Sequence, residues 1–92
     1  MNYTLKLTAD AIEDIETLKK AGDKPTLKKL ATLLKELTEH PRTGTGQPEE
    51  LKYNLAGCWS RRISAKHRLV YRIEEEQVTV IILFASGHYK DK

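Results

Sequence analysis

The spacing of the apolar residues changes halfway along this chain, and this change limits the folds that it can adopt. Between residues 9 and 37, apolar side chains recur every three or four residues, as in amphipathic helices. Between residues 58 and 85 they alternate with polar residues or form short runs, as in strands. A chain of 92 residues has room for one small core. We therefore expect one α+β domain over residues 1–92, with 90–92 as a short tail.

The first part of the chain predicts a strand followed by a helical hairpin. Residues 3–7 alternate between apolar and polar side chains, which is typical of a half-buried strand. Thr8 offers an N-cap for a helix that ends at Gly22, a common C-terminal stop. A second helix starts at residues 23–25, with proline in its first turn, and ends at residues 40–41.

The second part predicts a small antiparallel sheet. Residues 42–50, RTGTGQPEE, contain two glycines, one proline and no apolar residue, which indicates a loop. Four segments follow, the last three of them clearly strand-like: 51–54, 58–64, 67–74 and 77–85. We expect three or four antiparallel strands with the helices packed on one face. The other face, called the open face below, would contact solvent or a ligand.

The alternation along these strands predicts which side chains reach the open face. If the apolar faces pack on the helices, the open face carries Arg62, Arg68 and Arg72. Like charges lined up in this way repel one another unless they are paired. The alternative is a solvated face neutralised by glutamates, and it carries most weight for Arg72, which lies close to residues 74–76.

The positive charge of the chain lies in its second half. Residues 1–40 hold seven lysines and seven acidic residues, whereas residues 41–92 hold nine basic and six acidic residues. The whole excess of +3 therefore belongs to residues 41–92, together with all five arginines. Because the planar guanidinium group suits phosphates and carboxylates, this distribution predicts an anionic partner for the second half.

Several function classes are excluded or disfavoured. The chain is too short for a TIM barrel or a kinase, and no apolar run approaches the roughly 20 residues that span a bilayer. The one cysteine, Cys58, allows no intrachain disulfide and reads as a half-buried structural thiol rather than a nucleophile. We expect a cytoplasmic protein without signal peptide or membrane partner. The three histidines are not spaced for metal binding, so no metal or cofactor is expected.

A dense sequence motif in the second half of the chain limits the possible functions further. Residues 40–63 are HPRTGTGQPEELKYNLAGCWSRRI, followed by HRLVY at 67–71 and by His88 and Tyr89. This run resembles the YoeB/Txe group of bacterial toxins, which belongs to the RelE/ParE-like superfamily, and the resemblance covers essentially the whole second half. It implies the RelE/ParE-like α+β fold. It also implies a type II toxin that acts as an mRNA endoribonuclease on translated messages.

The resemblance assigns roles to individual residues. It implies that the catalytic residues are Glu49, Arg68, His88 and Tyr89. It also implies that RNA is bound by Lys52 and Arg62. Metal-free cleavage of RNA uses the ribose 2′-OH as the nucleophile against the adjacent 3′-phosphate. Glu49 is then the base, His88 the acid near neutral pH, and Arg68 the clamp on the phosphate charge. Tyr89 would stack on a base or bond to the phosphate.

The resemblance also implies partners. These are a cognate antitoxin with an acidic, partly disordered segment, the mRNA in the ribosomal A site, the 70S ribosome, and a second copy in a homodimer. Two alternatives remain open. A ParE-like toxin that acts on DNA gyrase without catalysis would not need the Glu49, Arg68 and His88 set, and a degenerate toxin would only bind its antitoxin.

Overall fold

The order of helices and strands follows the change in hydrophobic spacing. The computed structural model describes residues 2–85. Their elements are β1 (Thr4–Leu7), α1 (Ala9–Ala21), α2 (Lys24–Leu37), β2 (Glu49–Glu50), the short 3₁₀ helix η1 (Tyr53–Leu55), β3 (Cys58–Arg62), β4 (Arg68–Glu74) and β5 (Thr79–Phe84). The predicted α+β class, with a strand, a helical hairpin and then antiparallel strands, is confirmed.

Short-range signals set the ends of the two helices. The Thr8 hydroxyl accepts a hydrogen bond from the Ala11 amide at 3.1 Å, which caps the start of α1. Gly22 ends α1 in the left-handed conformation, with φ of 71°. Asp23 caps α2 by accepting from the Thr26 hydroxyl at 2.7 Å and from the Thr26 amide at 3.3 Å, and these hydrogen bonds lower the pKa of the Asp23 carboxyl. The predicted starts of both helices and the predicted end of α1 are confirmed, whereas α2 ends at Leu37, before the predicted residues 40–41.

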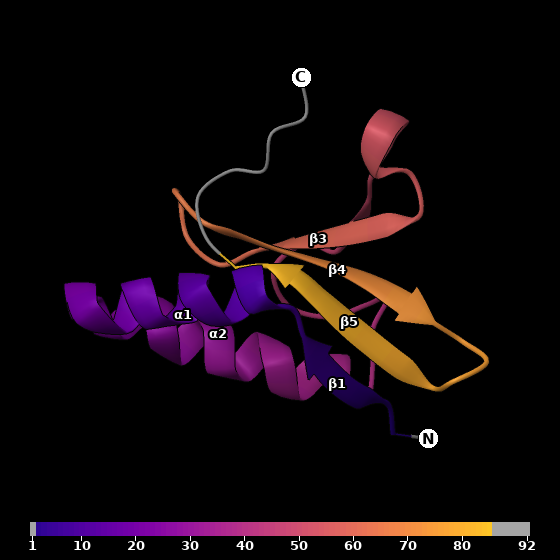
Figure 1. Ribbon diagram of the computed structural model, residues 1–92, viewed down its shortest axis with the longest axis horizontal. Coiled ribbons are helices and arrows are strands. Elements are labelled where there is room, and N and C mark those ends of the chain that lie inside the picture. Colours follow the sequence, from indigo (N-terminus) through magenta and orange to yellow (C-terminus); the bar gives the residue numbers. More distant parts are fainter. Residues whose placement is uncertain (1, 86–92) are drawn as a thin grey trace.

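The five strands form one mixed sheet in the order β1-β5-β4-β3-β2. The pairs β2–β3, β3–β4 and β4–β5 are antiparallel, while β1 runs parallel to β5 and pairs Thr4 with Thr79. Both helices lie on one side of this sheet (Figure 1). Their apolar stripes pack against alternate residues of the central strands, which gives a core of fully buried side chains that includes Leu33, Leu37, Leu69, Tyr71, Val80 and Ile82.

Residues 51–54, the segment that left the number of later strands at three or four, do not form a strand. Strand pairing occurs two residues earlier, at Glu49–Glu50 inside the predicted loop, and the chain then turns into η1. Tyr53 has a φ of 59°, which is incompatible with an extended strand. The three later segments are confirmed as β3, β4 and β5, each shorter than predicted.

The open face is partly covered by a second apolar cluster. Its buried members are Leu51, Cys58 and Val70, with Leu55, Leu83 and Phe84 packed against them. The burial of Cys58 raises the pKa of its thiol, which supports the structural role predicted for it. One part of the open face is thus apolar and filled, and the polar part lies elsewhere on the strands.

We predict that Leu33→Ala lowers the free energy of unfolding by about 2–5 kcal/mol, because Leu33 is fully buried between α2 and the sheet. Ile12→Ala on α1, where the side chain is 51% exposed, serves as the matched control and should change it by less than about 1 kcal/mol. Urea denaturation followed by circular dichroism measures both. Equal losses in the two variants would contradict this placement of the core.

Candidate functional site

The sheet register brings three of the predicted site residues onto the open face. Glu49 pairs with Ser60, and Arg62 pairs directly with Arg68. Opposite residues in an antiparallel pair point to the same face, and Ser60 and Arg62 are two residues apart on β3. Glu49, Arg62 and Arg68 therefore share one face, in which a carboxylate stands diagonally across from a pair of guanidinium groups.

The two arginines at this place are not engaged by the rest of the described chain. Within residues 2–85, no ion pair or hydrogen bond is formed by the side chain of Arg62 or Arg68. Two like charges directly opposite one another in a sheet are unfavourable. The repulsion between the two guanidinium groups falls when a negatively charged group binds between them. The geometry therefore suits an anionic ligand.

A serine hydroxyl adds a donor next to the carboxylate. Ser60 is fully buried, and within the described residues its Oγ has no hydrogen-bond partner. It lies opposite Glu49 on β2 and opposite Val70 on β4. A buried hydroxyl without a partner costs about 1–3 kcal/mol, so a bond to the Glu49 carboxylate or to a bound ligand would be favourable.

Of the other predicted site residues, only Lys52 lies within the described part of the chain. Lys52 is exposed just before η1, and its neighbour Leu51 is anchored in the apolar cluster of the open face. His88 and Tyr89 lie outside the described residues. The last strand, β5, ends at Phe84, which pairs with Val70 two residues from Arg68. The chain thus leaves the sheet beside the end of β4 that carries Arg68.

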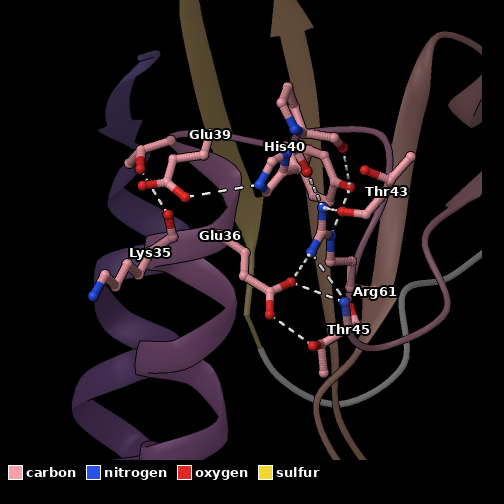
Figure 2. A network of polar contacts seen from close by, with 10 residues as sticks. Lys35, Glu36, Glu39, His40, Thr43, Thr45 and Arg61 are labelled. Carbon is pink, nitrogen blue, oxygen red and sulfur yellow. Dashed lines mark hydrogen bonds and ion pairs between the residues drawn. The ribbon is translucent and has the colours of Figure 1, made fainter. Parts of the chain in front are cut away.

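Arg61 is the residue that the sequence reasoning missed. Although it is adjacent to Arg62, it points to the helix side of the sheet and is fully buried. Its five N–H donors make five hydrogen bonds (Figure 2). They go to the Tyr71 hydroxyl at 3.1 Å, Glu36 Oε1 at 2.9 Å, and the carbonyl oxygens of Thr45 at 3.3 Å, Thr43 at 2.6 Å and His40. Arg61 therefore ties α2 and the loop before β2 to the sheet.

Two glycines let the loop come this close. A Cβ at Gly44 would lie 2.5 Å from Glu36 Oε1 and 3.2 Å from Arg61 Nη1. A Cβ at Gly46 would lie 2.9 Å from the carbonyl oxygen of Arg62, and the Gly46 carbonyl accepts the Arg62 amide at 2.7 Å. Both glycines have positive φ, which other residues adopt only at a cost. The glycines of the motif thus fit the loop around Arg61.

Glu36 completes this contact from the helix. One of its oxygens accepts from the Thr45 hydroxyl at 2.6 Å, and the other accepts from the Thr45 amide at 2.8 Å and from Arg61. The hydrogen bond from the Thr45 side chain is the main cause that lowers the pKa of the Glu36 carboxyl, and Arg61 adds to it. Glu36 is thus held in its ionised form, beside the guanidinium that it pairs with.

The other arginines of the second half also have partners within the protein. Arg72 pairs with Glu74, with Nε and Oε2 2.8 Å apart, as the solvated-face alternative predicted. Arg42 pairs with Glu75, and this contact lowers the pKa of the Glu75 carboxyl. Three of the five arginines are therefore part of the scaffold, and Arg62 and Arg68 are the two whose side chains have no ion pair or hydrogen bond within residues 2–85.

The described part of the chain offers neither a metal site nor a helix that could cross a membrane. Over residues 2–85, no group of three or more His, Cys, Asp or Glu side chains is placed to hold a metal ion. In the same part of the chain, neither helix has the length and apolar character that crossing a membrane requires.

Solved structures with this arrangement of helices and strands are bacterial toxins. The YoeB/ParE toxin from Agrobacterium tumefaciens superposes with a TM-score of 0.86 at 34% identity, over 94% of this chain and 99% of that one. YoeB from Staphylococcus aureus, solved as a dimer, gives a TM-score of 0.82 at 34% identity, over 97% and 100% of the chains. The same relative solved in a heterotetrameric complex with YefM gives 0.80, with the same identity and coverage. The fold is that of a YoeB/RelE/ParE-like toxin.

Sequence comparison identifies the family within this class of toxins. A family model described as a YoeB-like toxin of bacterial type II toxin–antitoxin systems matches residues 7–89. Toxin YoeB of Escherichia coli (strain K12) is 45% identical over 67 residues, which are 73% of this chain and 77% of that protein. The chain belongs to the YoeB family of type II toxins, and the resemblance seen in the sequence is confirmed.

We predict that Arg61→Met lowers the free energy of unfolding by about 3–5 kcal/mol, because it leaves Glu36 and three loop carbonyls without their shared donor. Arg72→Met breaks only an exposed pair and should cost no more than about 1 kcal/mol. Urea denaturation at neutral pH compares the two. A loss at Arg61 no larger than that at Arg72 would refute the anchoring role.

The lowered pKa of Glu36 predicts a dependence of stability on pH. A carboxyl with a lowered pKa in the folded state contributes stability above its ordinary value of 4.5, and this contribution disappears as the pH falls through the folded-state value. The free energy of unfolding should therefore fall more steeply below about pH 4.5 in the wild type than in Glu36→Gln. Urea titrations between neutral and acid pH test this. Parallel curves would show that Glu36 is not linked to folding.

Proposed function

We propose that this YoeB-family toxin is a ribosome-dependent endoribonuclease that cleaves translated mRNA by general acid–base catalysis. The observation that carries the proposal is the strand register, which sets Glu49 on the same face as the opposed pair Arg62 and Arg68. A base beside two unengaged guanidinium groups is the arrangement that attack on a phosphodiester requires.

The reaction divides among these groups as follows. Glu49 removes the proton of the ribose 2′-OH, and the oxygen attacks the adjacent phosphorus. Arg68 bonds to the phosphate oxygens, which gain negative charge in the transition state. The bond to the 5′-oxygen breaks, and His88 donates the proton that this leaving group takes up. The products are a 2′,3′-cyclic phosphate and a 5′-hydroxyl.

Chain geometry supports the assignment of the acid to the C-terminal segment. Phe84 pairs with Val70, and His88 is four residues further on. Four residues span at most about 14 Å, which is enough to return from the end of β5 to the Arg68 end of β4. Tyr89, the next residue, would then contact the same phosphate or a neighbouring base. Lys52 and Arg62 would bind flanking phosphates.

The proposal extends to partners. The ribosome holds the message in its A site, and the 70S particle is the second partner, so the toxin would act in the cytoplasm. The S. aureus relative is described as a dimer and as a heterotetramer with YefM. We propose likewise that a cognate antitoxin neutralises this chain with an acidic, partly disordered segment placed over Arg62 and Arg68, and that the toxin pairs with a second copy.

In a translating extract, the purified protein should cut the coding region of a message and leave a cyclic or 3′-phosphate and a 5′-hydroxyl. Glu49→Gln and His88→Gln should each slow cleavage by about 10²–10⁴-fold. Arg68→Ala should slow it by about 10²–10³-fold, since it removes a donor to the transition state. Primer extension and end-labelling measure the rate and the ends.

Glu50 and Arg72 provide matched controls for Glu49 and Arg68. Glu50 pairs with Trp59, which packs into the helix-side core, so Glu50→Gln alters the adjacent residue of the opposite face. Arg72→Ala removes an open-face arginine that already pairs with Glu74. Both controls should cleave at nearly the wild-type rate. Intact message together with inhibited DNA gyrase would reject the proposal in favour of a ParE-like activity.

A further inference from the structure

Tyr53 presents an aromatic ring to solvent on the first residue of η1. Its side chain is 88% exposed, compared with 51% for Ile12 and 37% for Leu7, the other large hydrophobic residues exposed within the described chain. Tyrosine normally buries most of its ring, and burial of aromatic rings supplies much of the binding energy at interfaces. The exposure of Tyr53 therefore leaves a large apolar surface available to a partner.

The backbone holds this ring in a strained conformation. Tyr53 has a φ of 59°, in the left-handed region that bulky residues rarely adopt. Gln47 and Val78 share this feature, but Gln47 carries no large apolar surface and Val78 is half-buried. Residues in sparsely populated conformations persist only where the surroundings fix them, and they gather at binding sites.

The surroundings do fix this turn. The amide of Ala56 donates to the carbonyl of Tyr53 at 2.9 Å, and the amide of Leu55 donates to that of Lys52 at 3.1 Å. Leu55 packs on the apolar cluster formed by Leu51, Cys58 and Val70. The turn is thus anchored on its inner side, while the ring of Tyr53 and the ammonium group of Lys52 remain on its outer side.

The turn lies on the same face as the proposed catalytic groups. Leu55 of η1 packs on the apolar cluster of the open face, and η1 lies next to β3 and far from α1 and α2 (Figure 1). It joins β3 at Cys58, and Arg62 is at the other end of that strand, about 13 Å away at 3.3 Å per residue. Glu49 lies between these ends, opposite Ser60. Since stacked nucleotides follow one another at about 3.4 Å, this face is longer than one nucleotide.

We infer that Tyr53 is a stacking platform for a base of the message beside the nucleotide that is cleaved, with Lys52 binding the phosphate next to it. The inference rests on the proposed endoribonuclease function and adds a substrate-binding residue to it. Every base has a flat aromatic face, so stacking contributes affinity without base preference. The strained, anchored turn keeps the ring in place before the message arrives, which reduces the entropy lost on binding.

The test compares two substitutions at this residue. Tyr53→Asn removes the ring but tolerates positive φ, so the turn remains and the free energy of unfolding should not fall. Tyr53→Phe keeps the ring and is the matched control. Binding is measured to 70S ribosomes programmed with a message whose A-site codon carries 2′-deoxynucleotides and is therefore not cleaved. Tyr53→Asn should weaken binding by about 5- to 150-fold, the range measured for loss of one stacked base, and Tyr53→Phe by much less.

Cleavage of an ordinary message provides the second readout. With Tyr53→Asn, KM should rise while kcat stays close to the wild-type value, because stacking acts on bound substrate and transition state alike. If the wild type binds but does not cleave, the proposed function fails while the binding comparison still decides the role of Tyr53. Equal binding by wild type and Tyr53→Asn, or no binding by the wild type, would overturn the inference. So would a loss of self-association or antitoxin binding with ribosome binding intact, since Tyr53 would then be a protein contact.

Discussion

The hydrogen bonds of one buried guanidinium group hold the structure of the site together. Arg61 uses all five of its donors on α2, on β4 and on the loop that leads to β2. A buried charge without such partners would be strongly destabilising, so the loop before β2 is held in one conformation. This loop leads to Glu49, and the position of the Glu49 carboxylate therefore depends on Arg61, whose side chain lies on the opposite face of the sheet.

Arg61 and Arg62 have different roles because successive side chains of β3 point to opposite faces of the sheet. Arg61 points toward the helices and is satisfied by protein, whereas its neighbour Arg62 points to the open face and lies opposite Arg68. A one-residue slip of β3 would exchange the two and would place an unsatisfied charge in the core. The buried arginine thus also specifies the strand register. The same requirement that stabilises the fold keeps Arg62 on the face where an anion can bind.

Local patterns in the sequence were sufficient for most of the fold. The Thr8 cap, the Gly22 stop and the faces of β3 and β4 depend on neighbouring residues and could be predicted. The contact between Arg61 and Glu36 joins distant elements, and the motif shows only that two arginines are adjacent. The one available signal was that Arg61 alternates with Trp59 and Ile63 on the apolar face. The turn at Tyr53 was missed because its positive φ has no marker in a residue that favours strands.

The parallel pairing of β1 with β5 makes the completion of the sheet a long-range event. Within residues 2–85, β1 has β5 as its one neighbour in the sheet, and Thr4 pairs with Thr79. The strands β3, β4 and β5 follow one another along the chain and pair as antiparallel neighbours, so their contacts are local. Contacts of long sequence separation form slowly because the intervening chain must first be closed into a loop. The addition of β1 to the sheet is therefore a slow step of folding, after the antiparallel strands have paired.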